Sequence, residues 1–442
     1  MLLSCGSAAM ADGMMLEARH GVAIEAAEPS AVSDLHRLGF TDPMDASDRR
    51  LLALLSAFDL KLEVGRSLDG SAWIAAAVWE PRDGTTGDVF SGTGFQPAGA
   101  IRSCLGEFAE FQSWLFRPGD ATRRDATAAR TIDPWSVLGF SDRQRAEPDA
   151  AAAYDDIPSG DTFAGEIDWS EALCLNDGLP ARVPSQLCFG RYAQRAHAAP
   201  SNWRNDSNGC AAGATQDAAR LAALLELIER DATGIWWYGR CRLPGLDPAR
   251  LGQPALHAAI EARTQGGQTV QLLDLTHDLR VPVVAAILFQ DEQLLGLGFG
   301  CKLSIGAAAV SAYLELCQME LSIALAKQRA NPGDEQLLRW VKDITPGSCP
   351  YLTPAGSGET ATASEPTFEG VVERLRSTGL RTYAIDLQRT DLAIPAVRLF
   401  VPGLCHYKPR LGHQRLVEVP QKLGWRPEGL GTTGLNAMPL LI

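Results

Sequence analysis

Residues Ser207–Asp231 read SNGCAAGATQDAARLAALLELIERD, a run that begins with small residues and ends with apolar and acidic ones. Glycine and alanine in the first half predict a tight loop, and the apolar residues that follow predict a buried helix. Residues three apart on a helix share a face, so Glu226 and Glu229 project their carboxylates to the same side. The segment therefore predicts an acidic helix face with little water around it.

The same pattern occurs in three copies along the chain. The copies Gly94–Glu110, Gly213–Glu229 and Lys302–Gln318 each place a Glu thirteen positions after their first residue, and a Glu or Gln three positions later. The resulting pairs are Glu107/Glu110, Glu226/Glu229 and Glu315/Gln318. Most single pairs of this kind are simply charged residues on the solvent-exposed face of a helix. Three pairs in one register within apolar helices favour a shared site instead.

Carboxylates in apolar surroundings cost several kcal/mol unless a cation or another partner neutralises them. Oxygen ligands from several helices suit Mg²⁺, which usually arrives with phosphates. The chain has no GxxxxGK[ST] loop, so phosphates would be held through metal-bridging carboxylates together with Arg230 and Lys302. The run Gly296-Leu-Gly-Phe-Gly300 follows an apolar stretch, but glycine spacing alone is a weak dinucleotide-binding pattern.

Composition limits the class of protein. The chain has 442 residues, 46% of them hydrophobic and 21% charged, with a net charge of −13, as in a soluble globular protein. An acidic chain without a Lys/Arg run is not expected to bind nucleic acid or an anionic membrane. The longest apolar run, residues 283–289, is far too short to span a membrane. Ten scattered cysteines without a CxxC motif predict reduced core thiols and a cytoplasmic protein.

Strand and helix patterns are mixed along the chain, so the fold class is predicted as α/β or α+β with mixed sheets. The expected strands are residues 73–79, 269–274, 281–289, 380–386 and 396–401, and the expected helices are 51–60 and 311–329. Residues 83–94 are rich in glycine and threonine and predict a loop. We expect residues 1–65 to form a variable segment, 66–425 the main domain and 426–442 an irregular tail.

The combination of SNGxAxG at Ser207–Gly213 with ExxERD at Glu226–Asp231 resembles the YcaO family. Further matches follow in order: Gly92–Gly94 with Ser103, Glu107 and Glu110, then Glu315 with Gln318, then Val401–Leu404. The resemblance covers roughly residues 91–425. It implies a YcaO-type fold whose buried helices carry the ExxE motifs, and an ATP site that uses Glu-bound Mg²⁺ in place of a P-loop.

The resemblance also implies roles for individual residues. Four glutamates, Glu107, Glu110, Glu226 and Glu229, are expected to bind Mg²⁺ at the phosphates. Arg230 is expected to face phosphate oxygens and, with Glu229, to be catalytic. Additional nucleotide contacts are expected from Ser103, Ser207, Lys302 and Gln318.

YcaO cyclodehydratases use ATP to convert Cys, Ser or Thr of a ribosomally made precursor peptide to thiazoline or oxazoline. We expect this activity here. The expected partners are the precursor peptide, a separate ubiquitin-activating-enzyme-like or leader-binding protein, and a flavin-dependent azoline dehydrogenase. The family also implies a homodimer.

Several positions depart from the family pattern. Phe111 stands where an Arg is usual, Ala214 where an Asn is common, Ala218 where a Glu is frequent and Ser322 where an Arg is frequent. Two alternatives therefore stay open beside the cyclodehydratase. One is a backbone activator that forms a thioamide or amidine, and the other is a non-catalytic subunit that scaffolds a synthetase complex.

Overall fold

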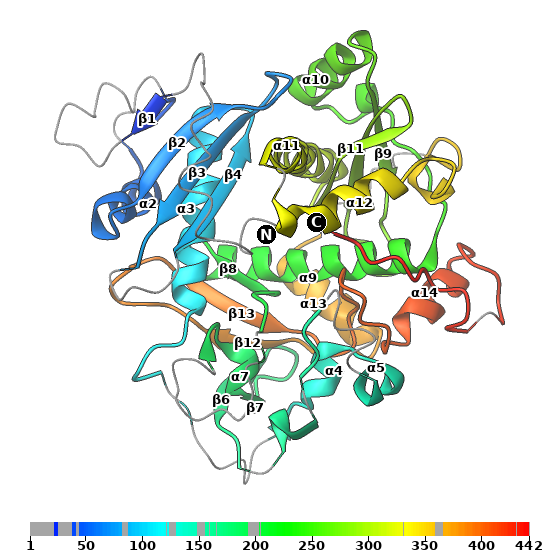
Figure 1. The fold of residues 1–442 in the computed structure, drawn as a ribbon. Helices are drawn as coiled ribbons and strands as arrows, with labels where there is room; N and C mark the ends of the chain where they lie inside the picture. Colours follow the sequence, from blue (N-terminus) through cyan, green and yellow to red (C-terminus); the bar gives the residue numbers. More distant parts are fainter. Residues whose placement is uncertain are drawn as a thin grey trace.

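The computed structural model describes residues 22–24, 38–40, 44–81, 87–120, 122, 130–147, 155–158, 160–164, 166–192, 203, 205–329, 331–358, 366–429 and 431–441. Within these ranges the chain forms three sheets with helices packed on them (Figure 1). The predicted fold class, α/β with mixed sheets, is confirmed. Much of the expected variable segment, including residues 1–21 and 25–37, lies outside the described residues.

The first sheet is antiparallel, with the strand order β1-β2-β3-β4. It comprises β1 (Val22–Ile24), β2 (Lys61–Arg66), β3 (Trp73–Trp79) and β4 (Asp88–Gly94), and it packs with α2 (Ala46–Ala57) and α3 (Pro97–Trp114). The expected strand 73–79 is present as β3. The expected loop 83–94 is wrong in its second half, because residues 88–94 pair with β3 as β4.

The second sheet has the order β11-β10-β9. Its strands are β9 (Thr269–Asp274), β10 (Val283–Gln290) and β11 (Gln293–Cys301), and its helices are α10 (Pro254–Gln265), α11 (Ile305–Arg329) and α12 (Glu335–Asp343). Alternate residues of β10 belong to two hydrophobic cores on opposite faces of the sheet. This two-sided burial explains why the strand is apolar at every position up to Phe289.

The third sheet has six strands in the order β5-β7-β6-β12-β13-β8. They are β5 (Arg130–Thr131), β6 (Trp169–Cys174), β7 (Pro180–Pro184), β8 (Cys210–Ala212), β12 (Tyr383–Asp386) and β13 (Ala396–Phe400). The shorter helices near this sheet and at the C-terminal side are α4 (Pro134–Leu138), α5 (Asp142–Ala146), α7 (Ser185–Cys188), α13 (Phe368–Ser377) and α14 (Arg415–Lys422).

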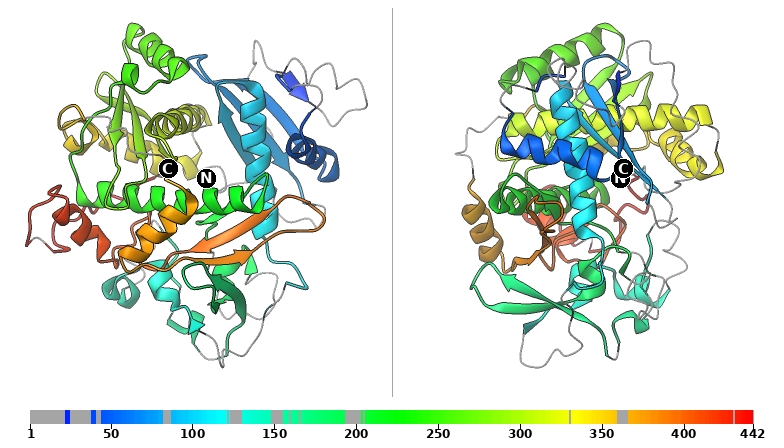
Figure 2. Two further views of the ribbon diagram at one scale, coloured as in Figure 1. Left: turned by 180° about the vertical axis from the view of Figure 1, so that it is seen from behind. Right: turned by 90° about the vertical axis from the view of Figure 1, so that its left-hand side faces the viewer.

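Helix α9 (Gln216–Gly239) crosses the centre of the molecule between the second and third sheets (Figures 1 and 2). It begins at Thr215, whose side chain accepts a hydrogen bond from the Ala218 N–H. Residues of α9 share one core with both β10 and β13. The motif-bearing helix is therefore buried on two sides, as the apolar sequence between its glutamates predicts.

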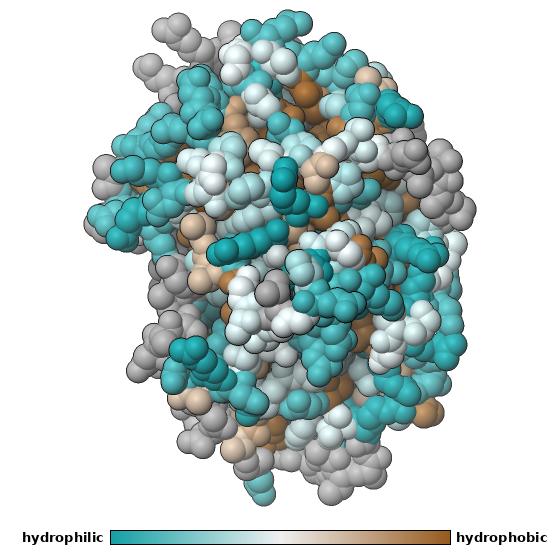
Figure 3. Space-filling model, turned by 90° about the vertical axis from the view of Figure 1, so that its right-hand side faces the viewer, coloured by the Kyte–Doolittle hydropathy of each residue, from teal (hydrophilic) through white to brown (hydrophobic). Residues whose placement is uncertain are grey.

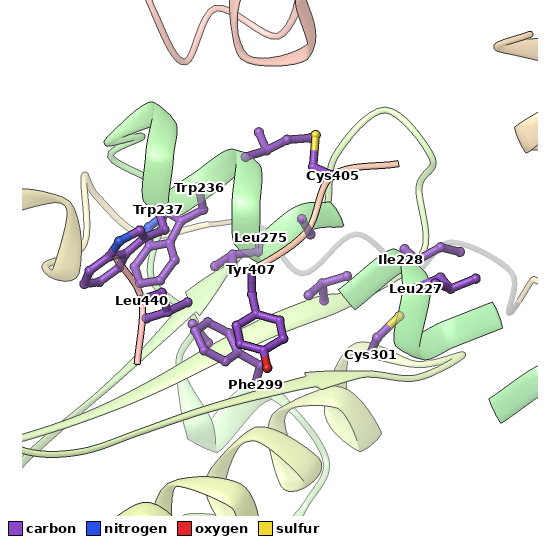
Figure 4. Packing of buried hydrophobic residues seen from close by; sticks show 14 of the residues in the cluster. Leu227, Ile228, Trp236, Trp237, Leu275, Phe299, Cys301, Cys405, Tyr407 and Leu440 are labelled. Atoms are coloured by element: carbon purple, nitrogen blue, oxygen red, sulfur yellow. The ribbon is translucent and has the colours of Figure 1, made fainter. Parts of the chain in front are cut away.

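The C-terminal tail is irregular but is packed against the end of α9. Trp237 Nε1 donates to the Met438 carbonyl at 2.7 Å, and the Asn436 N–H donates to the Tyr238 carbonyl at 2.8 Å. Trp236, Trp237 and Leu440 lie together in this core (Figure 4). The aromatic run of α9 thus has a packing role.

The surface is mostly hydrophilic and the core apolar, as the composition of the chain predicts. The face shown in Figure 3 is mostly hydrophilic, with apolar residues scattered over it. Among the described residues, α11 alone is long and apolar enough to cross a membrane, and it packs on β10 and β11 through residues such as Ala312 and Leu316, which are fully buried. The cysteines in the described part of the chain are free and buried, as predicted for core thiols.

Candidate functional site

The first Glu of each repeat is held by the strand or loop that precedes its helix. In each case one carboxylate oxygen accepts a hydrogen bond from a backbone N–H. The pairs are Ser91 N–H to Glu107 (3.1 Å), Gly209 N–H to Glu226 (3.3 Å), and Phe299 N–H to Glu315. The sequence repeat is therefore a structural repeat, in which an extended segment orients the first Glu of the helix that follows.

Glycines allow the extended segments to approach the helices so closely. A Cβ at any of three positions would collide with the backbone of the helix. It would lie 2.1 Å from Cys104 N if built on Gly92, 2.6 Å from Ala219 N if built on Gly213, and 2.3 Å from Ala312 O if built on Gly298. The glycine run 296–300 is therefore part of strand β11, which α11 covers, and its spacing serves packing.

The three helices bring their carboxylates into one electrostatic cluster. Glu110 on α3 is influenced by the charge of Glu226 on α9, and Glu315 on α11 is influenced by the charge of Glu229. A direct contact also joins α11 to the first sheet, since Gln318 Nε2 donates to Ser91 Oγ at 2.6 Å. Residues from three distant segments thus meet, as the repeat predicts.

Burial makes this cluster unfavourable to ionise. It raises the pKa of Glu226 to about 7, because the nearby Arg230 offsets only part of the desolvation. Burial and the charge of Glu229 together raise the pKa of Glu315 to about 7. Burial likewise raises the pKa of Glu107, and it raises that of Glu110 well above its usual value. When these carboxyl groups ionise, their negative charge exceeds what the neighbouring arginines compensate, so the cluster fits a divalent cation.

Magnesium needs few protein ligands at such a site. In the described part of the chain, no three His, Cys, Asp or Glu side chains are placed to hold a metal ion together. Mg²⁺ is commonly bound by one or two carboxylates, with phosphates and waters completing its octahedron. The paired glutamates of α3 and α9 match that requirement when the phosphates supply the remaining ligands.

Arg230 lies among the carboxylates of the cluster. Its guanidinium is 3.8 Å from Glu226 Oε1 and 3.8 Å from Glu229 Oε1, longer than a hydrogen bond in both cases. Its carbon Cζ stands 4.7 Å from the ring centroid of Tyr407. Its donors are therefore not consumed by the neighbouring glutamates.

Arg398 is a residue of this region that the sequence analysis missed. It lies on β13, is 3% exposed, and its charge lowers the pKa of Glu110 against the larger effect of burial. The one available signal was a charged residue inside the apolar strand AVRLF. Glu315 was also left out of the expected ligands, although its register in the third repeat pointed to it.

The remaining expected residues lie on or next to the elements that carry the cluster. Ser103 is exposed, one helical turn before Glu107 on α3. Ser207 is half-buried, and its carbonyl accepts the Cys210 N–H at 2.8 Å. Lys302 is exposed directly after β11. Their contacts with a nucleotide stay predictions.

The residues at the positions that depart from the family pattern pack elsewhere or are exposed, and they leave the acidic cluster open. Phe111 packs between Phe90 and Trp114, with ring centroids at 5.1 and 6.1 Å, and the guanidinium of Arg191 lies 5.5 Å from its ring. Ala214 and Ala218 are exposed at the start of α9. Ser322 Oγ donates to the Gln318 carbonyl at 3.0 Å.

Comparison with known proteins places these features in a family. A family model described as YcaO cyclodehydratase, ATP- and Mg²⁺-binding, matches residues 91–405. The predicted cofactors are those of this family. An uncharacterized protein of Methanothermobacter thermautotrophicus is 26% identical over 312 residues, which are 64% of this chain and 80% of that protein.

Solved structures show the same architecture. A heterocyclase in complex with substrate and cofactor has a TM-score of 0.74 and 27% identity, over 84% of this chain and 53% of that one. This chain therefore spans about half the length of that heterocyclase. YcaO of Methanopyrus kandleri, bound with AMPPCP and Mg²⁺, has a TM-score of 0.56 and 21% identity over 81% of this chain and 92% of its own, a likeness of fold.

Proposed function

The chain belongs to the YcaO family, and we propose that it is an ATP- and Mg²⁺-dependent cyclodehydratase acting on a ribosomally made precursor peptide. The proposal rests above all on the meeting of carboxylates from α3, α9 and α11, two of them with a pKa of about 7. An acidic cluster of this kind suits a Mg²⁺-bound triphosphate in a protein that has no P-loop. The likeness to a heterocyclase with bound substrate and cofactor supports it.

The proposed reaction removes water from a peptide. A Cys, Ser or Thr side chain attacks the preceding carbonyl carbon and loses its proton, and the former carbonyl oxygen takes the γ-phosphoryl group of ATP as ADP leaves. Phosphate then departs and the amide nitrogen loses its proton, so that the C=N bond of thiazoline or oxazoline forms. Bound Mg²⁺ would neutralise charge on the phosphates. Glu107, Glu110, Glu226 and Glu229 would hold it, and Glu315 extends this set to α11.

The other side chains would hold and orient the nucleotide. Arg230 has guanidinium donors that are free to face phosphate oxygens, which a planar guanidinium binds in pairs. Gln318 would contact the nucleotide as well, at a place where its Nε2 donates to Ser91 Oγ on β4. Ser103, Ser207 and Lys302 would also contact the nucleotide.

The proposal also includes partner proteins and an oligomeric state. A leader-binding, ubiquitin-activating-enzyme-like protein would deliver the peptide, a flavin-dependent dehydrogenase would oxidise azoline to azole, and the chain would form a homodimer in the cytoplasm. A thioamide- or amidine-forming reaction would use the same nucleotide site with a different nucleophile.

The non-catalytic alternative is favoured by Phe111, Ala214 and Ala218, which remove potential ligands. Phosphate release separates it from the proposed enzyme. We expect purified chain, with its delivery partner and precursor peptide, to release phosphate, and Glu229→Gln to reduce that rate by at least about 100-fold. Changes to residues that only support metal ligands already cost about 10–100-fold.

Glu261→Gln is the matched control, because this glutamate on α10 is exposed and pairs with His257 of the same helix, at 3.7 Å. Its phosphate release should equal that of the unaltered chain. Mass spectrometry of the peptide identifies the product, since azoline formation loses one water per modified residue. Unchanged release in Glu229→Gln would remove the site assignment, and nucleotide binding without release would support the scaffold.

A further inference from the structure

An aromatic ring, as well as attraction to nearby carboxylates, positions the guanidinium of Arg230. The two glutamates beside it attract the guanidinium, yet both stay 3.8 Å away. Its aromatic contact is the Tyr407 ring, whose centroid is 4.7 Å from Cζ. A guanidinium over an aromatic face is attracted by the ring quadrupole. Stacking therefore opposes collapse of Arg230 onto the acidic cluster.

The segment that carries Tyr407 is docked along one face of α9. The Cys405 N–H donates to Asp231 Oδ1 at 2.7 Å, and Tyr238 Oη donates to the Tyr407 carbonyl at 2.7 Å. Between them, a Cβ on Gly234 would lie 2.5 Å from the His406 carbonyl oxygen. Figure 4 shows Cys405 and Tyr407 on this segment beside α9. Positions 231, 234 and 238 thus form a seam that fixes the ring.

The seam is anchored by a fully buried carboxylate. Asp231 accepts hydrogen bonds from Arg415 at 2.6 to 3.1 Å, and His277 Nε2 lies 3.0 Å from its Oδ2. The charge of Arg415, together with the nearby His277, outweighs burial and holds the pKa of Asp231 well below its usual value. Asp231 follows Arg230 directly in the chain, so one turn of helix carries both the arginine and the anchor of its aromatic support.

We propose that Tyr407 is a positioning residue for Arg230, holding the guanidinium off Glu226 and Glu229 so that its donors face bound phosphates. The inference rests on the proposed function, because it needs a nucleotide at the acidic cluster. It assigns Tyr407 a role through Arg230 only, with no contact between the tyrosine and the nucleotide.

Binding of Mg²⁺·AMPPCP, measured by titration calorimetry, tests the proposal without any turnover. Tyr407→Leu keeps an apolar side chain but removes the ring face, and we expect it to weaken binding by about 3- to 30-fold. Tyr407→Phe keeps the face and should stay within about 2-fold. Phe140→Leu is the matched control, because it removes a ring 5.1 Å from Arg410, which Asp155 and Asp206 hold by ion pairs.

A double variant distinguishes positioning from a general loss of structure. In an Arg230→Gln background, Tyr407→Leu should cause no further loss of affinity, whereas a merely structural role would add its effect. Equal binding by the unaltered chain and Tyr407→Leu, or an equal loss in Phe140→Leu, overturns the positioning role and leaves the proposed function intact. Failure of the unaltered chain to bind Mg²⁺·AMPPCP overturns the proposed function and this inference with it.

Discussion

Glu226 and Glu315 each satisfy one carboxylate oxygen with a backbone N–H and remain short of positive charge. Burial raises the pKa of both to about 7, whereas a Glu in an unfolded chain titrates near about 4.3. The folded, nucleotide-free protein therefore binds more protons at these groups than the unfolded chain does. Raised pKa values of this kind are expected at functional carboxylates whose charge a bound cation neutralises.

This proton excess predicts how stability depends on pH. A carboxyl group with a raised pKa contributes stability fully below about pH 4.3 and loses it as the pH rises through about 7. We therefore expect the Tm of the nucleotide-free protein to fall more steeply between about pH 5 and 8 than that of a Glu226→Gln, Glu315→Gln double variant. Thermal unfolding in matched buffers measures the difference.

Glu261→Gln serves as the control, because that residue is exposed, and its pH profile should follow the unaltered chain. Added Mg²⁺ and AMPPCP should restore the Tm above pH 7 in the unaltered chain, and not in the double variant. Parallel pH profiles for the unaltered chain and the double variant would contradict the assignment of raised pKa values to this pair.

At the scale of elements, the repeated unit is a glycine-containing extended segment covered by the helix that follows it. The strand backbone contacts the helix backbone directly, so rotation of a side chain could not make room for an added Cβ. At Gly298 an added Cβ would lie 2.3 Å from both Ala312 O and Leu316 N. Packing at native density leaves no room for this methyl group.

Gly298→Ala should therefore destabilise the protein by about 1–3 kcal/mol or more, as overpacked cores do. Gly106→Ala, within α3, is the matched control because no atom of the described residues lies within 4 Å of the position its Cβ would take. That change should be neutral or stabilise by about 0.4–1 kcal/mol. Denaturant unfolding measures both. A Gly298→Ala protein as stable as the unaltered chain would refute the close-packing account of the repeat.

At the scale of the whole molecule, a buried polar cluster ties the first sheet to α10 and α11. Arg263 on α10 pairs with Asp69 at 2.8 Å and with Glu320 at 2.8 Å, and its side chain is 1% exposed. Tyr313 on α11 donates to Asp69 Oδ2 at 2.9 Å. Because α3 carries Glu107 and α11 carries Glu315, this cluster helps to set the relative positions of the two acidic helices.

Asp69→Ala should destabilise the protein by about 1–3 kcal/mol, because the buried guanidinium of Arg263 loses one of its two carboxylate partners. It still pairs with Glu320 in this variant. Hydrogen exchange in α11 should accelerate with it. Asp391→Ala is the control, since Asp391 pairs with Arg117 at the surface, and should change stability by no more than about 0.5 kcal/mol. Equal unfolding midpoints for the two variants would show that the cluster does not join the two parts.

Much of the fold was predictable because its signals are local. The strands 73–79 and 269–274 are present with those bounds, and α11 contains the expected helix 311–329. Family and fold class are confirmed. The expected loop 83–94 was wrong for a specific reason. Glycine lowers strand propensity, so β4 and β11 resemble loops in sequence, although their glycines are required by helices packed against them.

For the candidate site, spacing along single helices was enough to identify Glu107, Glu110, Glu226, Glu229 and the pairing of Glu315 with Gln318, since positions three apart share a face. Their roles with a nucleotide stay predictions. Arg398 and Tyr407 could not be found in this way. They reach the cluster from a strand and a loop that lie far beyond the end of α9 at Gly239, and only the packing of β13 and of segment 405–407 against α9 brings them there. Local periodicity specifies what each helix presents, whereas long-range packing specifies which charges meet.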